Sequence, residues 1–240
     1  MKIVAIIPAR YAATRFPAKL MQLLEGKTII RHTYENTVAT GLFDEVIVAT
    51  DSEIIFKEIT ENGGKAVITK GNHESGSDRI AEVAKEMDVD IIINVQGDTP
   101  FVNKGALEKI IKVFEDATVK VASLMQILEE EKYIEDKNYV KVAVDKYMNS
   151  LMFSRSVIPY PRNKEIAITY YEHIGVYAFR KDALLKFTEW EVTPLEIAEK
   201  IECLRYLENG IPLRMIVVNG IGVEIDTPED LERASRALKL

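Results

Sequence analysis

Cysteine is nearly absent from this sequence, and so are long apolar runs. Cys203 is the only cysteine among the 240 residues, which excludes a disulfide within the chain and suits a reducing compartment. No apolar run approaches the roughly 20 residues that a membrane-spanning helix requires. Residues 1–7 enter a strand-like run directly, with no small-residue cleavage site behind it, so we expect no signal peptide. These absences predict a cytoplasmic protein without a membrane partner.

An excess of positive charge is also lacking. The chain carries 31 Lys and Arg against 38 Asp and Glu, a formal net charge of −7, whereas nucleic-acid-binding proteins usually present a basic face. We therefore expect no nucleic-acid partner. An acidic protein that binds an anionic substrate must gather its cations locally, so the places where Arg and Lys cluster are informative.

Several familiar signatures are missing as well. The sequence has no Walker A motif and no GxGxxG spacing, which argues against a P-loop enzyme and a dinucleotide binder. It has no His/Cys metal-binding spacing and no serine-nucleophile elbow. It also has no internal repeat, low-complexity tract or Pro/Gly/Ser-rich linker. Since 47% of the residues are hydrophobic, enough to build a substantial core, we expect a single domain over residues 1–240.

What the first half does have is an alternation of strand and helix patterns. Short apolar runs predict strands at residues 3–7, 45–49, 66–68 and 91–95. Helical spacing predicts helices over about residues 29–38 and 54–59 and from near residue 77. This alternation is typical of α/β proteins with a mainly parallel sheet that helices cover on both faces. Ligands of such sheets bind at the carboxyl ends of the strands, which here means residues 8–19, 50–51, 69–79 and 96–100.

The second half is less regular. Residues 140–144 and 150–153 look like the two strands of a hairpin, and residues 174–179 look like a further strand. Thr193 and Pro194, followed by Glu196, form a capping-box start for a helix. Residues 226–230 repeat this chemistry before a final helix, expected over residues 231–238. These elements predict a mixed sheet within the α/β class.

Three cations follow the first strand within ten residues. Arg10, Arg15 and Lys19 would repel one another at one strand end unless an anion neutralised them. A nucleoside triphosphate would do so, because the guanidinium fork of arginine matches phosphate oxygens. The alternative is a solvated basic loop, and the position directly after the first strand favours the phosphate site.

Two aspartates are candidate magnesium ligands. Asp98 follows the strand at residues 91–95, and Mg²⁺ prefers one or two carboxylates together with phosphate oxygens and waters. Taken alone, residues 97–98 could equally be an ordinary Gly-Asp turn. Asp226 precedes the last helix, where the helix dipole could by itself account for a carboxylate. Paired with Asp98, it becomes the other half of a metal site.

Residues 75–79 combine a small-residue turn with an arginine at a helix start. Backbone N–H groups at such a start can hold an anion or the edge of a base. An ordinary helix with Ser77 as its N-cap explains that serine but leaves Arg79 unexplained.

Arg155 and His173 are candidates for binding a carboxylated sugar. Arg155 comes directly after the predicted strand at residues 150–153, and His173 precedes the one at residues 174–179. A lone histidine is more often a structural residue than a catalytic one. Cys203 lies among apolar side chains on an expected helix and fits a core position.

Five segments, in this order and spacing, resemble one known family. Residues 7–10 (IPAR), with Arg15, Pro17 and Lys19, are similar to the N-terminal signature of the CMP-sugar synthetases. Four further segments narrow the resemblance to the 3-deoxy-manno-octulosonate cytidylyltransferase (CMP-Kdo synthetase) family: 95–98 (VQGD), 153–155 with 158–159 (FSR and IP), 173–177 (HIGVY) and 226–230 (DTPED). The resemblance runs from residue 3 to about residue 236.

The resemblance implies a Rossmann-like nucleotide-sugar transferase fold, a homodimer and a reaction in lipopolysaccharide synthesis. In that reaction CMP passes from CTP to the anomeric hydroxyl of Kdo, an acidic eight-carbon sugar, and pyrophosphate is released. Asp98 and Asp226 would hold the cofactor, Mg²⁺, and catalytic roles fall to Arg10, Lys19 and Asp98. The nucleotide site would comprise Pro8, Ala9, Arg10, Arg15, Lys19, Ser75, Gly76, Arg79 and Asp98, and the sugar site Gln96, Arg155, His173, Tyr177 and Glu202.

The sequence departs from the family pattern at three positions. Thr99 replaces the usual Glu of Gly-Asp-Glu-Pro, Cys203 replaces the usual Gln of Leu-Glu-Gln-Leu-Arg, and Glu172 replaces a cation before the histidine. The last two changes are expected near the sugar, whereas the phosphate and metal residues are intact. The sugar could therefore be Kdo, its 8-amino analogue or, less in keeping with Arg155 and His173, a nonulosonate. A nucleotide sensor that retains the fold without catalysis is the alternative of another class, which intact Asp98 and Asp226 disfavour.

Overall fold

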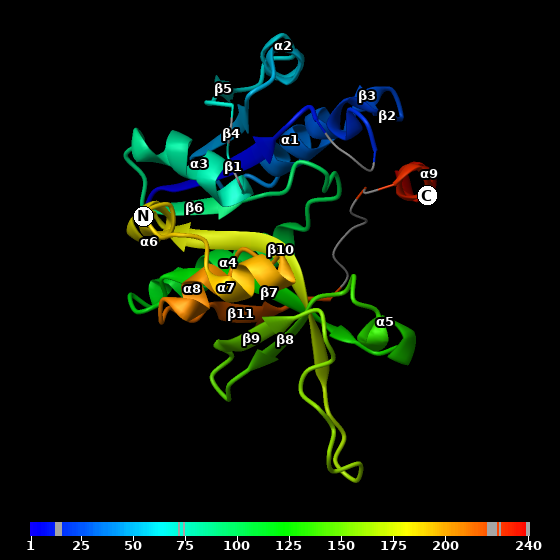
Figure 1. The fold of residues 1–240 in the computed structure, drawn as a ribbon. Coiled ribbons are helices and arrows are strands. Elements are labelled where there is room, and N and C mark those ends of the chain that lie inside the picture. Colours follow the sequence, from blue (N-terminus) through cyan, green and yellow to red (C-terminus); the bar gives the residue numbers. More distant parts are fainter. Residues whose placement is uncertain (13–15, 72, 74, 220–224, 226, 239–240) are drawn as a thin grey trace.

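Parallel strands from the first half of the chain form one side of a single sheet (Figure 1). In this computed structural model, which describes residues 1–12, 16–71, 73, 75–219, 225 and 227–238, β1 (Ile3–Ala9) lies parallel to both β4 (Glu45–Thr50) and β6 (Ile91–Asn94), and β5 (Ala66–Ile68) lies parallel to β4. The strands β1, β4 and β6 are almost continuously apolar because helices cover both of their faces. All four predicted strands are confirmed.

The second half adds antiparallel strands, so the sheet is mixed as predicted. β10 (Tyr170–Arg180) lies between β6 and β7 (Val121–Leu128) and runs antiparallel to both, and β11 (Arg214–Val217) extends β7 in parallel. The predicted hairpin is present as β8 (Lys141–Val144) and β9 (Ser150–Ser154), and β8 also pairs with β10. β7 and β11 were not predicted from the sequence.

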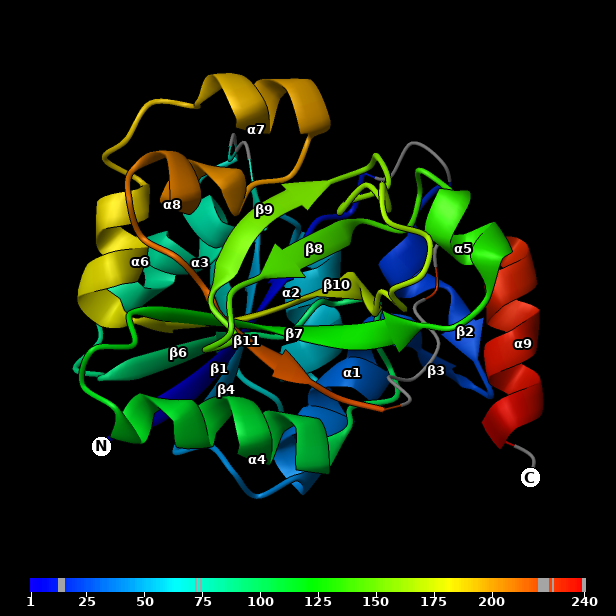
Figure 2. The ribbon, with the colours of Figure 1, turned by 90° about the horizontal axis from the view of Figure 1, so that it is seen from below.

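Helices pack on both faces of the sheet (Figures 1 and 2). Alternate residues of β1 point to opposite faces: Ala5 and Ile7 join a core with α1, α2 and α4, whereas Val4 and Ile6 join a core with α3, α6 and α8. The described helices are α1 (Ile29–Ala39), α2 (Glu53–Thr60), α3 (Gly76–Lys85), α4 (Lys104–Lys112), α5 (Glu131–Glu135), α6 (Lys181–Phe187), α7 (Pro194–Glu199), α8 (Leu204–Glu208) and α9 (Pro228–Leu238). Two 3-10 turns, η1 (Lys19–Met21) and η2 (Val113–Glu115), and a small hairpin of β2 (Leu23–Leu24) and β3 (Lys27–Thr28) complete the elements.

The start of α3 differs from the sequence prediction. Its N-cap is Ser75 and not Ser77: the Ser75 hydroxyl accepts from the Asp78 N–H (3.1 Å), and the Asp78 carboxylate accepts from the Ser75 N–H (3.1 Å). The reason is that a good capping partner three residues on exists for Ser75, namely Asp78. Ser77 instead lies inside the first turn with its side chain buried.

Other boundaries shift by a few residues. β1 continues through Pro8 to Ala9, in register with Thr50, and β10 begins four residues before the predicted start because its first part pairs with β7. α9 begins at Pro228 rather than at residue 231, since proline suits the first helical position. The predicted capping chemistry of this helix is present: the Asp230 carboxylate accepts from the Thr227 N–H at 2.9 Å.

Candidate active site

The loops after β1 and β6 and the start of α3 meet at Pro8. A Cβ built on Gly97 would lie 3.1 Å from the Pro8 carbonyl oxygen, tighter than most Cβ contacts, so a side chain there would require its neighbours to shift. A Cβ on Gly76 would lie 3.4 Å from Cγ of the same proline. Three of the segments that the sequence reading singled out therefore converge at the carboxyl end of the parallel strands.

A lysine and an aspartate of the predicted site are in direct contact. The Lys19 Nζ lies 2.5 Å from Oδ2 of Asp98. Lys19 comes from η1, and Asp98 follows β6 in the loop whose Gly97 carbonyl accepts from the Thr33 hydroxyl of α1 at 2.9 Å. Their side chains are 15% and 25% exposed, so the pair is accessible to a ligand from the rim of the sheet. A cation expected to hold phosphate thus lies beside a carboxylate expected to hold a metal.

The remaining phosphate and metal candidates are only partly described. Ala9 is buried at the end of β1 and Arg10 is exposed directly after it. Arg15 and Asp226 lie outside the described residues. Ile225, which precedes Asp226 in the sequence, donates its N–H to the Asp98 carbonyl oxygen at 3.1 Å. The described chain therefore returns to the Asp98 loop one residue before the second predicted metal ligand.

Arg79 has a structural role that the sequence did not indicate. Its guanidinium is buried and donates from Nη2 to Oδ2 of Asp51 (2.8 Å) and from Nη1 to Oγ1 of Thr69 (2.5 Å). Asp51 follows β4 and Thr69 follows β5, so Arg79 ties α3 to the ends of two strands. A contact of Arg79 with the nucleotide remains a prediction.

His173 lies in an aromatic setting and is uncharged. Its ring contacts those of Phe153 and Tyr177, with centroids 4.8 and 5.4 Å away, and its Nε2 lies 3.0 Å from the Ser123 hydroxyl. Burial lowers the pKa of His173 to about 3, because the cationic form loses its hydration. At neutral pH this histidine can hydrogen-bond to a ligand, but it carries no positive charge that could attract the carboxylate of a sugar.

Arg155 is held by backbone carbonyl groups. Its Nε donates to the Glu199 carbonyl oxygen (2.8 Å) and its Nη1 to the Lys137 carbonyl oxygen (3.0 Å). The Glu199 carboxylate accepts from the Arg155 N–H (3.0 Å) and from the Ser154 hydroxyl (2.6 Å). Carbonyl oxygens carry no formal charge, so these guanidinium bonds orient Arg155 and leave its positive charge available to an anion.

Glu202 and Gln96 connect the predicted sugar residues to the nucleotide segments. The Ser77 hydroxyl donates to Oε1 of Glu202 at 3.0 Å, and burial raises the pKa of that carboxyl. Gln96 donates from Nε2 to the Gly175 carbonyl oxygen of β10 at 2.8 Å. The structure thus joins the α3 start to Glu202 and the β6 end to the strand that carries His173 and Tyr177.

The departures from the family pattern fall in different places. Glu172 pairs through Oε2 with Nε2 of Gln126 (2.7 Å) on β7, and strand alternation puts it on the opposite face of β10 from His173. The expectation that this change falls near the sugar stays a prediction. The Cys203 thiol is buried, and burial raises its pKa, so it fits the predicted core position. Thr99 is buried, and its hydroxyl has no hydrogen-bond partner among the described residues.

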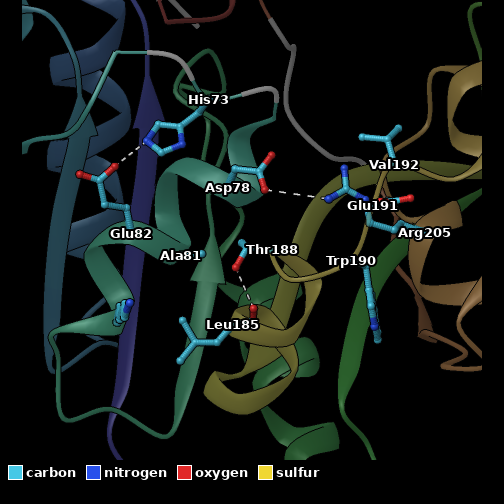
Figure 3. A pocket seen from close by; sticks show the side chains of 11 residues that line it. His73, Asp78, Ala81, Glu82, Leu185, Thr188, Trp190, Glu191, Val192 and Arg205 are labelled. Carbon is cyan, nitrogen blue, oxygen red and sulfur yellow. Dashed lines mark hydrogen bonds and ion pairs between the residues drawn. The ribbon is translucent and has the colours of Figure 1, made fainter.

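A separate groove of about 540 Å³ lies between α3 and the α6–α7 connection (Figure 3). On one side His73 Nε2 lies 2.6 Å from Oε2 of Glu82, and across it Nη1 of Arg205 lies 4.0 Å from Oδ1 of Asp78 (Figure 3). Arg205 is already bound to the Glu196 carboxylate through two bonds of 2.7 Å. The groove is lined by His73, Asp78, Ala81, Glu82, Lys85, Leu185, Thr188, Trp190, Glu191, Val192 and Arg205, a set that contains none of the predicted site residues.

Two absences hold within the part of the chain that the structure describes. None of its helices is long and apolar enough to span a membrane. Its His, Cys, Asp and Glu side chains form no group of three or more that could hold a metal ion.

Comparisons with known proteins agree on one enzyme family. The family model described as "Cytidylyltransferase" matches residues 4–218. The 3-deoxy-manno-octulosonate cytidylyltransferase of Flavobacterium johnsoniae is 55% identical, with 100% of this chain and 99% of the relative covered. The protein of the same name from Christiangramia forsetii is 52% identical, with 99% and 97% covered.

Two solved structures are similar in fold. CMP:2-keto-3-deoxy-manno-octonic acid synthetase, solved in complex with CTP, superposes with a TM-score of 0.95 at 37% identity, covering 100% of this chain and 99% of that one. A 4-diphosphocytidyl-2C-methyl-D-erythritol synthase from Anaerococcus prevotii has a TM-score of 0.65 at 17% identity, over 100% of this chain and 99% of that one. The second likeness concerns the fold alone.

Proposed function

The chain belongs to the 3-deoxy-manno-octulosonate cytidylyltransferase family, and we propose that the rim around Pro8 is where it carries out the reaction of that family. It is a nucleotidyltransferase that transfers CMP from CTP to Kdo and releases pyrophosphate. The product CMP-Kdo would serve lipopolysaccharide synthesis in the cytoplasm. The observation that carries the assignment is the full-length likeness to a synthetase solved with CTP, and the contact between Lys19 and Asp98 supports the site.

The reaction is an in-line displacement at phosphorus. The anomeric oxygen of the sugar forms a bond to the α-phosphorus of CTP, the bond to the β-phosphate oxygen breaks, and pyrophosphate leaves with that electron pair. The hydroxyl proton passes to solvent or to a leaving-group oxygen. The acidic sugar and the triphosphate of CTP are both anions and must approach each other, so preorganised cations at the site would lower the barrier most. Arg10, Arg15 and Lys19 would bind the phosphates and stabilise the charge that gathers on the leaving pyrophosphate.

The acidic residues suit a magnesium ion. Asp98 presents a partly exposed carboxylate beside the phosphate-binding lysine, and oxygen ligands of this kind are those that Mg²⁺ takes together with phosphate oxygens. We assign Asp98 and Asp226 as its ligands. When bound, Mg²⁺ would neutralise phosphate charge and polarise the attacking hydroxyl. Within the protein, Lys19 orients Asp98 and reduces its repulsion from the incoming phosphates.

The sugar site requires one cation and several hydrogen-bonding groups. Arg155, oriented by backbone carbonyls, would bind the carboxylate of the sugar. His173 stays neutral because burial lowers its pKa to about 3, so it would bind a hydroxyl. Glu202, Gln96 and Tyr177 would hydrogen-bond to further hydroxyl groups of the sugar. Burial raises the pKa of the Glu202 carboxyl. Ser75, Gly76, Arg79, Pro8 and Ala9 would surround the nucleotide.

A pyrophosphate-release assay tests both the reaction and the sugar. Purified protein is incubated with CTP, Mg²⁺ and, in turn, Kdo, 8-amino-Kdo and a nonulosonate. We expect turnover with Kdo and none without a sugar. Faster turnover with 8-amino-Kdo would favour the alternative that the Cys203 departure leaves open, and no turnover with any sugar would favour a nucleotide sensor.

Exposed apolar side chains support a homodimer. Several of them lie on β7, on the β8–β9 hairpin and on the segment between β9 and β10, and that segment projects from the body (Figure 1). Five of them are Ile127, Tyr147, Leu151, Tyr160 and Ile166, which are 47%, 64%, 63%, 82% and 63% exposed. Apolar surface of this kind is typical of protein interfaces. Light scattering after size exclusion should give twice the 27.2 kDa mass of the chain, and a monomeric mass would refute the dimer.

A further inference from the structure

A buried carboxamide at the end of β6 has no structural explanation. Asn94 is 0% exposed, and neither its Oδ1 nor its Nδ2 has a hydrogen-bond partner among the described residues. Leaving a buried donor or acceptor unpaired destabilises a protein, because the group has lost its hydrogen bonds to water. Asparagine is also a poor strand former compared with the three isoleucines that precede it in β6. An aliphatic residue would satisfy both strand and core, so the fold alone does not account for Asn94.

Asn94 lies between the nucleotide and sugar segments. It is in register with Ile6 of β1 and with Tyr177 of β10, and directly paired residues present their side chains to the same face of a sheet. Ile6 and Tyr177 both belong to the core on the α3 side. The carboxamide therefore faces α3, which lies beside β1 and β6 in Figure 1.

The first turn of α3 lies close to the Asn94 carboxamide. The Nδ2 atom of Asn94 lies 3.9 Å from the point where a Cβ on Gly76 would stand, and the same point is 3.4 Å from Pro8. The next residue, Ser77, donates to Glu202 at 3.0 Å. The first N–H groups of a helix have no acceptor within the helix. Because these N–H groups donate, the carboxamide would meet them through its Oδ1, and a small shift of this turn would bring that oxygen into hydrogen-bonding range.

We propose that Asn94 is a positioning residue for the nucleotidyl transfer. As the transfer reaches its transition state, its carboxamide hydrogen-bonds the first turn of α3 and fixes Gly76, Ser77 and Glu202 relative to Pro8. The carboxamide is unpaired among the described residues, and its cost is relieved in the transition state, so Asn94 stabilises that state more than the bound substrates. This inference rests on the proposed function, because it concerns the same site.

The pair Asn94→Val and Asn94→Thr tests the proposal, because valine and threonine have the same shape and differ by one hydroxyl. Asn94→Val should raise the Tm by about 2–4 °C, the shift that roughly 1 kcal/mol gives in a chain of this length, since it removes an unpaired polar group. It should lower kcat about tenfold while the KM for CTP changes less than about threefold, the pattern of a lost interaction specific to the transition state. Asn94→Thr should recover part of kcat without the gain in Tm.

The control is Ile92→Val, two residues earlier on the same strand and the same face. It should lower the Tm by about 2–4 °C with kcat unchanged, which separates stability from turnover. Equal kcat values for the valine and threonine variants, or wild-type kcat in Asn94→Val, would overturn the role of Asn94. No pyrophosphate release by the wild-type enzyme with CTP and Kdo would instead refute the proposed function.

Discussion

The ammonium group of Lys19 lies 2.5 Å from the carboxylate of Asp98, although the two residues come from different loops of the sheet rim. The pair holds opposite charges at a partly exposed position, where phosphate oxygens and a metal ion would compete for the same two groups. Neither residue needs the other for the fold, because η1 and the Gly97 turn are fixed by backbone bonds and by Thr33. This relationship gives the most direct test of the site.

Asp98→Asn should abolish turnover and leave the fold intact. The amide keeps the shape of the carboxylate but loses the charge that would hold Mg²⁺, and we expect kcat to fall at least about 10²–10³-fold, the loss typical of removing one electrostatic contact at a transition state. Pyrophosphate release and thermal unfolding measure the two effects. Asp182→Asn, at an ion pair with Lys120 whose aspartate is 70% exposed, is the control and should behave like wild type. An active Asp98→Asn enzyme would count against the metal assignment.

His173 should make stability depend on pH below neutrality. Its pKa is lowered from 6.5 to about 3 by burial, so between these values the unfolded chain binds a proton that the folded protein does not. The stability it contributes is therefore complete above pH 6.5 and falls as the pH drops toward 3. At pH 5 the loss is about 2 kcal/mol, from 1.36 kcal/mol per pH unit.

Urea unfolding at pH 7.5 and pH 5 measures this loss, and His173→Phe should reduce the difference between the two pH values. Ser123→Ala serves as the control: it removes the hydroxyl 3.0 Å from Nε2 but keeps the imidazole buried, so the pH dependence should remain. An unchanged pH dependence in His173→Phe would show that another group is responsible.

Periodicity and turn chemistry predicted the parallel half of the fold well, because strands such as β1 and β6 are short apolar runs with clear ends. β7 and β11 were missed: residues 121–128 contain a serine and a glutamine, Ser123 and Gln126, whose partners His173 and Glu172 come from a distant strand. Pairing between distant strands cannot be predicted from a short stretch of sequence. The same limit applies to the N-cap of α3, where Ser75 and Ser77 both offer a capping hydroxyl.

In the candidate site, too, local motifs located some residues, whereas contacts between distant residues could not be predicted. Motifs located Lys19, Asp98 and Gln96 because they follow strands at the rim, and the structure brings them to it. No motif could have indicated that Arg79 of α3 binds Asp51 and Thr69, since these two residues follow different strands, β4 and β5. Asn94 carried a weak signal, a polar residue ending a run of isoleucines, whose meaning depends on burial and on its lack of partners.

Arg79→Met should destabilise the protein strongly. The change keeps the aliphatic stem but leaves the Asp51 carboxylate without its buried partner, and breaking a buried ion pair in this way costs about 3–5 kcal/mol. Because Asp51 is 26% exposed, solvent should reduce the cost to the lower end of that range. Urea unfolding measures it.

Lys65→Met is the matched control for Arg79→Met. It breaks the ion pair between Lys65 and Glu45, in which the lysine side chain is 67% exposed, and it should destabilise the protein far less than Arg79→Met because solvent screens an exposed ion pair. Equal effects of the two substitutions would contradict the structural role of Arg79. A selective rise in the KM for CTP without loss of stability would assign Arg79 to the nucleotide instead.

Thr99→Val should stabilise the protein. The Thr99 hydroxyl is buried, has no partner within the described chain, and lies at a small, mostly apolar cavity with Val95, Leu124 and Val176. Replacing it with a methyl group removes the cost of an unpaired polar group, so the free energy of unfolding should rise by about 1 kcal/mol. Thr33→Val is the opposite case, because the Thr33 hydroxyl bonds the carbonyl oxygens of Ile29 (3.1 Å) and Gly97 (2.9 Å), and it should lose about as much. Urea unfolding of both variants measures these changes. If Thr99→Val were the less stable of the two, the Thr99 hydroxyl would have a hydrogen-bond partner in solution. The threonine at this position would then stabilise the Asp98 loop.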